Sequence, residues 1–375
     1  MKTNRHQPIP TSSPQNRWPA SLLWGIVEKF ARAALVSAKF LWALLLAVAA
    51  SPVAGGQPAD ATPHPVARSA PSTDSVVDPL PTPNAAPETY SDADSDAQRL
   101  RQQAAAALIE RTVVTLASGP AFDAKLTQQV RTPDHTAVGV GRYEQAGGNT
   151  GRVHMDMDIS ISQNQKCQLL QKCDGRLAWT REQVGDTVRL RRVDVGRLDE
   201  MVAAKMSAIS PRLRVGGLIE LLERAHADFA LEQVPAELEG HPVWMLKGSL
   251  RPAVKTDILR RAEREEWPPL CPNAIAIAIA ADNNDNGFGK GLPVRFEYWL
   301  ETEAEAEQAQ QAPTEMRRLI SYLKIYDLQK IQPAPETHFR LETGESDVNY
   351  TNDTQRYLDH FGIQVTEKQQ RLLTR

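Results

Sequence analysis

Cysteine is scarce in this sequence of 375 residues, which has three, and this excludes a small scaffold held together by several disulfides. Cys167 and Cys173 lie six residues apart, and a strand of that length spans ~20 Å. Because disulfide-bonded Cα atoms lie within ~7 Å of each other, these two cannot pair inside one strand. Their spacing also differs from that of a zinc clip, and Cys271 alone does not supply the missing ligands. A bridge from Cys271 to either of them remains open.

Positive charge is also in short supply. The first 50 residues hold six of the 43 basic residues and one of the 46 acidic residues, so the remainder carries eight more acidic than basic side chains. Nucleic acid is bound through clustered Lys and Arg, and a mildly acidic chain offers no such surface. We therefore expect no nucleic-acid partner.

A recognisable catalytic constellation is missing. The sequence has no Gly-x-Ser-x-Gly elbow, and no set of nucleophile, base and orienting group can be named from it. We therefore expect a protein that is not an enzyme, with no catalytic residues and no cofactor.

Two short patterns resemble metal sites. His154, Asp156 and Asp158 would lie on one side of a strand, but the apolar residues between them explain the spacing as the wet face of an amphipathic strand. The stretch "DNNDNG" at 282–287 begins like a calcium loop, yet its twelfth position is Pro293, where a bidentate Glu is required. We favour a polar hairpin loop there and expect no metal site.

Apolar runs are short. The run "FLWALLLAVAA" at 40–50 has 11 residues, whereas a transmembrane helix needs ~20. Lys29, Arg32 and Lys39 precede the run and the small residues "SPVAGG" follow it, which is the order of a secretory signal. Residues 1–54 are thus predicted to be a signal peptide or, alternatively, an uncleaved N-terminal membrane anchor. Either alternative places the rest of the chain in the periplasm or cell envelope.

The composition of the chain after residue 54 divides it into a linker, a main domain and a tail. Residues 55–95 are rich in Pro, Ala and Ser with few large apolar side chains, so they cannot offset the entropy of ordering and are predicted to be a disordered linker. The main domain is predicted to span 96–365, followed by a tail at 366–375. It opens with an amphipathic helix over 96–118, which ends before Gly119 and Pro120.

After that helix the apolar period changes to two. In "VHMDMDISI", Val153, Met155 and Met157 face one way while polar residues face the other, as in a half-buried antiparallel strand. Further helices are expected at 196–206, 216–227, 253–265 and 352–361. The expected strands lie at 122–130, 137–144, 153–161, 166–173, 176–184, 187–195, 227–233, 242–250, 273–281, 293–301, 317–329 and 337–342.

Two of these strand regions allow a closer interpretation. Asp174-Gly175 is a turn dipeptide, so "KCQLLQKCDGRLAWTRE" at 166–182 is predicted to be a β-hairpin with Leu177 and Trp179 on one face. The "AIAIAIA" of 274–280 is favoured as one buried strand of the core, although its small alanines could also let a ligand approach.

Taken in order, these elements resemble the LolA/LolB superfamily of periplasmic lipoprotein carriers. The stretches that carry the resemblance are "AFDAKLTQQV" with "GVGRYEQ" after it, and the ending "FRLETGESDVNYTNDTQRYLDHFG". In addition, "LLQKCDGRLAWTRE" and "GGLIELLERAHADFAL" look like uncharacterised LolA-like exported proteins of planctomycetes. The carriers' Arg-Pro motif has no counterpart in the loop "EQAGGNTGR", so the resemblance assigns no ligand-binding residue to this sequence.

The resemblance implies an α+β fold that is mainly antiparallel β: a half-open β-barrel of about 11 strands covered by helices, whose apolar cavity binds acyl chains in characterised members. Members also include periplasmic sensors. From alternation, the inward candidates for lining such a cavity are Met155, Met157, Ile159, Leu177, Trp179, Val294 and Phe296. The alternative for each is ordinary core packing.

We therefore expect an exported envelope protein that binds a hydrophobic ligand, either a lipid or a lipidated protein, without catalysis. The alternative is an envelope sensor or scaffold that acts through protein–protein contacts.

Overall fold

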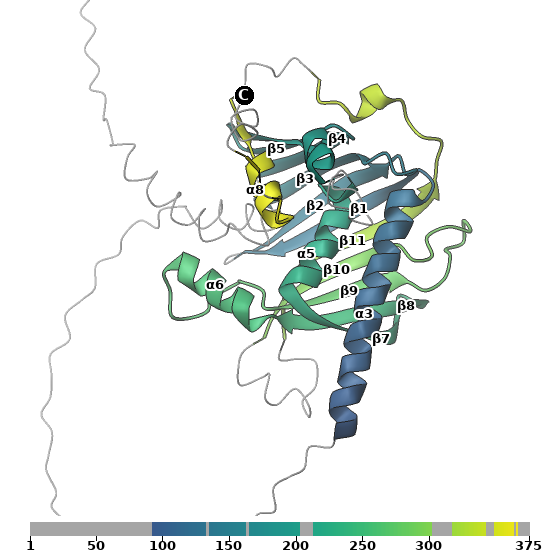
Figure 1. The fold of residues 1–375 in the computed structure, drawn as a ribbon, viewed down its shortest axis with the longest axis vertical. Helices are drawn as coiled ribbons and strands as arrows, with labels where there is room; N and C mark the ends of the chain where they lie inside the picture. Colours follow the sequence, from purple (N-terminus) through teal and green to yellow (C-terminus); the bar gives the residue numbers. More distant parts are fainter. Residues whose placement is uncertain are drawn as a thin grey trace, which may run out of the picture.

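The computed structural model describes residues 92–132, 135–162, 165–202, 213–301, 317–342, 349–363 and 365–366 (Figure 1). The predicted signal or anchor at 1–54, most of the predicted linker and residues 367–375 of the predicted tail lie outside these residues. Within them, no helix is both long enough and apolar enough to cross a membrane.

Twelve strands form a single sheet in the order β12-β6-β5-β4-β3-β2-β1-β11-β10-β9-β8-β7. All neighbours pair antiparallel except β12, which runs parallel to β6. Because β7 and β12 are edges, the sheet is open, and the α+β class and the half-open sheet covered by helices are confirmed. The strands are β1 (Phe122–Arg131), β2 (Thr136–Gln145), β3 (Arg152–Ser162), β4 (Gln165–Asp174), β5 (Leu177–Val184), β6 (Thr187–Asp194), β7 (Phe229–Leu238), β8 (His241–Leu250), β9 (Ala274–Ala280), β10 (Pro293–Leu300), β11 (Arg318–Lys330) and β12 (Tyr350–Asn352).

The strand predicted at 337–342 is wrong. The chain there forms a short 3₁₀ helix, η3 (Glu336–Phe339). Pro333 and Pro335 precede it, and proline has a fixed φ and no N–H to donate to a ladder. The side chain of Phe339 is instead buried, at 1% exposure, and anchors this segment against the domain.

Helices cover one face of the sheet (Figure 1). The described helices are α3 (Asp92–Ser118), α4 (Val195–Val202), α5 (Gly217–Asp228), α6 (Pro252–Ala262) and α8 (Thr354–His360). The long helix α3 contacts β7 and α5, while α8 contacts β6 and α4. The inward side chains of the strands and the apolar side of α5 form one continuous core. We call the covered side of the sheet the inner face.

The hairpin predicted from its Asp-Gly turn is confirmed. β4 and β5 pair antiparallel across Gly175 and Arg176, with Cys173 opposite Ala178. All three cysteines are free and buried, so the bridge to Cys271 that the sequence left open does not form.

The polar loop predicted at 282–287 is also confirmed as the connection of a hairpin between β9 and β10. The side-chain oxygen of Asn284 accepts hydrogen bonds from the backbone N–H groups of Asn286 and Phe288, at 3.0 and 3.1 Å. Strand β9 itself is buried from Ala274 to Ile279, which supports the interpretation of "AIAIAIA" as a core strand.

Helix α5 begins at two glycines with positive φ, Gly216 at 85° and Gly217 at 64°. The backbone N–H of Gly217 donates a hydrogen bond to the side-chain oxygen of Gln171 on β4, at 3.0 Å. A Cβ on Gly217 would lie 2.8 Å from the hydroxyl oxygen of Tyr143, which is fully buried. The absence of a side chain here therefore lets the helix start directly against the inner face.

We predict that Gly217→Ala lowers the free energy of unfolding by about 2–4 kcal/mol, because backbone strain at positive φ adds to overpacking against Tyr143. Gly240→Ala is the matched control, since Gly240 also has positive φ (83°) but open space around its Cα. It should cost only about 1 kcal/mol. Urea unfolding followed by circular dichroism measures both, and equal losses in the two variants would contradict this account of α5.

Candidate functional site

Five of the seven residues predicted to line a cavity lie on the inner face. Met155, Met157 and Ile159 of β3 are buried, at 4% exposure or less, and Phe296 of β10 is fully buried. Val294 is half-buried and packs against the same core. These residues belong to one core cluster together with Leu218 and Leu222 of α5. Their role in ligand binding stays a prediction.

Leu177 and Trp179 do not point inwards, and that expectation is wrong. Ala178 pairs with Cys173, and both belong to the core, so the two neighbours of Ala178 face outwards. The ring of Trp179 instead packs edge-on against Tyr350, with ring centroids 5.5 Å apart. The register set by the two-residue turn therefore determines which side chains of β5 face the core, and the size of the side chains does not.

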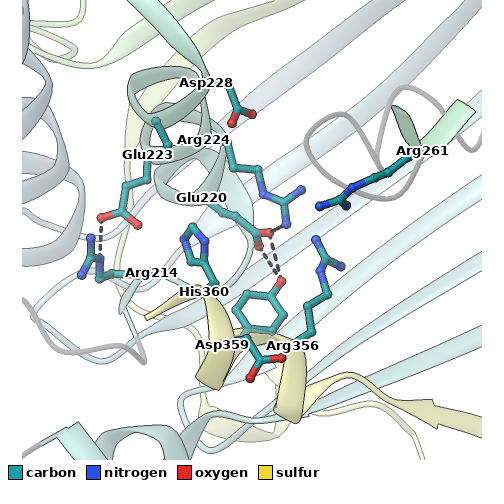
Figure 2. Close-up of a pocket in the computed structure, with 11 residues that line it drawn as sticks. Arg214, Glu220, Glu223, Arg224, Asp228, Arg261, Arg356, Asp359 and His360 are labelled. Carbon is teal, nitrogen blue, oxygen red and sulfur yellow. Dashed lines mark hydrogen bonds and ion pairs between the residues drawn. The ribbon is translucent and has the colours of Figure 1, made fainter. Parts of the chain in front are cut away.

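A charged pocket of about 460 Å³ lies beside α5, where α6 and α8 approach it (Figure 2). Four of its residues are arginines and four are acids, a composition that the sequence analysis did not single out. Its lining comes from the segment before α5, from α5 itself, from the end of α6 and from α8, and consists of Arg214, Glu220, Glu223, Arg224, Ala227, Asp228, Arg261, Arg356, Tyr357, Asp359 and His360.

Glu220 organises the centre of the pocket. Its carboxylate accepts hydrogen bonds from the backbone N–H of Gly216, at 2.7 Å, and from the hydroxyl of Tyr357, at 2.9 and 3.1 Å, and it pairs with Arg224 one turn later. Burial opposes the charge of Glu220, but Arg224 and the two hydrogen-bond donors outweigh burial and lower the pKa of the carboxyl. Glu220 is therefore ionised at neutral pH.

Three guanidinium groups gather on one side of Glu220. Figure 2 shows Arg224, Arg261 and Arg356, from α5, α6 and α8, pointing into the same region. Arg261 pairs with Asp257 at 2.7 Å, whereas Arg356 lies 3.8 Å from Asp353. Burial and, after it, repulsion from Arg224 lower the pKa of Arg356, while Tyr357, Glu220 and Asp353 act against this shift. An anion placed between the guanidiniums relieves this repulsion and finds several planar donors.

The opposite side of the pocket is closed by a separate ion pair. Arg214 and Glu223 lie 2.5 Å apart between guanidinium nitrogen and carboxylate oxygen, and Arg214 also lies over the ring of Phe361. Burial, followed by the charge of Arg224, lowers the pKa of His360, so its ring is neutral at pH 7. On the other side, Arg224 pairs with Glu220 and Arg261 pairs with Asp257, while the acidic partner of Arg356, Asp353, is more distant, at 3.8 Å.

The histidine and two aspartates that the sequence placed on one strand face are indeed on the outer side of β3. His154 and Asp156 are half-buried and Asp158 is exposed, while the residues between them enter the core. Burial and the neighbouring Asp158 raise the pKa of Asp156. In the part of the chain that the structure describes, the three do not form a common ligand set.

Comparison with known proteins finds no protein-family profile and no curated protein that matches this sequence. Solved structures do match. The MucA/MucB complex of Pseudomonas aeruginosa is 9% identical, with a TM-score of 0.28, over 64% of this chain and 62% of that chain. The MucB structures are spanned only in part, at 60 to 63% of their length.

Two further matches are spanned almost completely. A LolA superfamily protein from Nitrosomonas europaea is 13% identical, with a TM-score of 0.27, over 63% of this chain and 97% of that chain. A DUF1329 family protein from Desulfovibrio piger is 7% identical, with a TM-score of 0.28, over 64% and 97%.

We predict that Glu220→Gln lowers the free energy of unfolding by about 3 kcal/mol at pH 7, because it leaves Arg224 without its buried partner. The folded-state pKa of Glu220 is lowered from 4.5, so the carboxylate stabilises the fold above that value and this contribution is lost as pH falls through the folded pKa. The difference between wild type and variant should therefore shrink in acid.

Glu239→Gln provides the control. The pKa of Glu239 is also lowered, by Lys324, but its side chain is 52% exposed, so the variant should lose less than about 1 kcal/mol at pH 7. Urea unfolding at pH 7, 5 and 3 measures both variants. A loss for Glu220→Gln that stays constant down to pH 3 would contradict the role given to its charge.

Proposed function

We propose that this chain is an exported protein of the cell envelope that binds a hydrophobic molecule, either a lipid or a lipidated protein, without catalysing a reaction. The observation that carries the proposal is the joint position of the apolar inner face and the arginine pocket, which lie on either side of helix α5. Leu218 and Leu222 of α5 pack into the core, while Glu220 and Arg224 line the pocket.

The inner face supports the apolar part of such a ligand. Met155, Met157 and Phe296 belong to the core cluster, and helices instead of a second sheet cover this face (Figure 1). Methionine adapts to irregular apolar shapes, and each methylene group that leaves water for such a surface contributes ~0.8 kcal/mol. An acyl chain that reaches this face replaces contacts that α5 now makes with it.

The pocket supports an acidic group on the same ligand. Arg224, Arg261 and Arg356 offer planar donors that match a carboxylate or a phosphate, and burial together with the nearby Arg224 opposes the charge of Arg356. A fatty acid or a phospholipid has both an apolar chain and such a head group. We therefore propose an anionic amphiphile as the ligand class.

The proposed export rests on the N-terminal sequence. A basic flank, the short apolar run at 40–50 and small residues after it form the order of a secretory signal, followed by a polar, Pro-rich stretch suited to a tether. The acidic balance of the remaining chain suits a protein that does not bind nucleic acid.

A sensor or scaffold is the second candidate, and one observation favours it. Val138 and Val140 of β2 are 43% and 59% exposed and lie two residues apart on the outer face. Exposed apolar side chains grouped in this way are typical of protein contacts. A partner protein bound there would leave the inner face and the pocket free.

We predict that the full chain, purified gently from the envelope of its host, carries a lipid in stoichiometric amount. Native mass spectrometry followed by solvent extraction detects it. Met157→Asp should abolish the lipid because a charged group on the apolar face must be desolvated, whereas Met157→Leu, of similar volume, should retain it. Circular dichroism establishes that both variants are folded. A wild-type chain that is free of lipid and takes up no fluorescent fatty acid contradicts the proposal.

We also predict that the pocket selects for negative charge on the ligand. Wild type should bind a fluorescent fatty acid more tightly than its neutral methyl ester, and Arg356→Gln should weaken binding of the acid about tenfold while leaving the ester unchanged, since one charged hydrogen bond contributes about 1.5 kcal/mol. Arg189→Gln, at an exposed arginine of β6, is the control. Equal loss for acid and ester in Arg356→Gln would argue against a head-group role.

A further inference from the structure

A second cluster of polar side chains lies on the outer face of the sheet, away from the pocket. Glu144 of β2 and His154 of β3 are directly opposite each other in the antiparallel register. Facing residues of this kind have Cβ atoms about 5 Å apart, so their side chains share one site. His338 of η3 completes the cluster, although it lies 184 residues from His154 in the sequence.

The segment that carries His338 is held over the strands by its own contacts. Glu336 accepts a hydrogen bond from Arg152 of β3 at 2.6 Å, and Phe339 is buried at 1% exposure. The rings of His154 and His338 meet edge to face, with centroids 4.8 Å apart. Both sides of His338 are thus fixed to the domain, and the position of its imidazole is defined.

Three ligand atoms converge in this cluster. Nδ1 of His154 lies 3.0 Å from Nε2 of His338, and that nitrogen lies 2.9 Å from Oε2 of Glu144. All three atoms lie within 4.8 Å of one another. Metal–ligand bonds of 2.0–2.1 Å around a tetrahedral zinc ion place ligand atoms about 3.3 Å apart. The two short separations are close to that value, and the third, between the ligand atoms of Glu144 and His154, is no more than 4.8 Å.

Hydrogen bonds alone do not satisfy all three side chains of this cluster. A nitrogen of a neutral imidazole either donates or accepts, yet Nε2 of His338 faces both the carboxylate of Glu144 and Nδ1 of His154. If that nitrogen carries a hydrogen, one hydrogen must serve two acceptors. A metal ion in its place would be coordinated by all three lone pairs.

The charges around the cluster are largely compensated. Arg142 pairs with Asp123 and Arg152 pairs with Glu336, each at 2.6 Å. Lys172 of β4 lies opposite His154 in the register. Its positive charge is expected to weaken the binding of a metal ion. Glu144 supplies the negative charge of the site, with its side chain 10% exposed.

We propose that Glu144, His154 and His338 bind a divalent transition-metal ion of the zinc class. Two imidazoles and one carboxylate form a donor set that zinc accepts, and a three-ligand set leaves a position for water or a further group. Calcium and magnesium are not expected because they require oxygen ligands. The ion would join β2, β3 and η3, and so fasten the segment that leads to β12 and α8 onto the sheet.

Metal titration of the full chain tests this site. The protein is prepared without a polyhistidine tag, stripped with EDTA and titrated with zinc chloride by calorimetry and with cobalt(II) chloride by visible absorption. Wild type should bind one ion per chain and develop cobalt absorption bands in the visible range. His154→Ala and His338→Ala should each weaken zinc binding at least tenfold, whereas His241→Ala, at an exposed histidine of β8, should bind as wild type does.

Glu144→Gln keeps the size of the side chain and removes its charge, so weaker zinc binding in this variant cannot be attributed to loss of folding. It should also weaken zinc binding at least tenfold. Circular dichroism compares the folds of all variants, and limited proteolysis asks whether zinc protects residues 331–342. A wild-type chain that takes up no zinc, or variants of Glu144, His154 and His338 that remain folded and bind as wild type, would overturn the proposal.

Discussion

The close approach of helix α5 to the inner face determines the arrangement of both the core and the pocket. Gly216 and Gly217 adopt positive φ, and the absence of a side chain at Gly217 allows contact with Tyr143 and with Gln171 of β4. Once the helix starts there, its 3.6-residue period directs Leu218 and Leu222 to the core and Glu220 and Arg224 to the opposite side. One backbone contact therefore sets where apolar and charged surfaces lie relative to each other.

Burial makes the charges of the pocket interdependent. Glu220 loses hydration when α8 covers it, and it recovers favourable contacts only because Gly216, Arg224 and Tyr357 all direct donors at its two oxygens. A buried carboxylate with fewer partners would be expected to take up a proton. Glu220 and Asp353 favour the charged form of Arg356, but burial and repulsion from Arg224 outweigh them and lower its pKa.

Alternation along the chain was sufficient to predict the long strands, because each of them buries one face and a period of two follows from that burial. It failed where the register depended on a turn: Leu177 and Trp179 are large and apolar, yet Cys173 and Ala178 occupy the inner face. The pocket could not be predicted, since its residues come from 214–228, 261 and 356–360 and meet only in the folded chain. The sequence grouped His154 with Asp156 and Asp158 and favoured the wet face of a strand, so the side chains that meet His154 in the folded chain were not predicted. Side chains two apart on a strand are ~6.6 Å from each other, whereas Glu144 lies directly across from it and His338 comes from a distant segment.

The outer-face cluster and the pocket share one stretch of chain. His338 contacts the outer side of β2 and β3, and 18 residues later Arg356 and Tyr357 enter the pocket on the inner side. Between them β12 adds to the edge of the sheet beside β6. The entropy cost of closing a loop grows with the number of residues in it. Contacts made by His338 therefore shorten the part of the chain that must be ordered when α8 docks, and they favour the position in which Tyr357 meets Glu220.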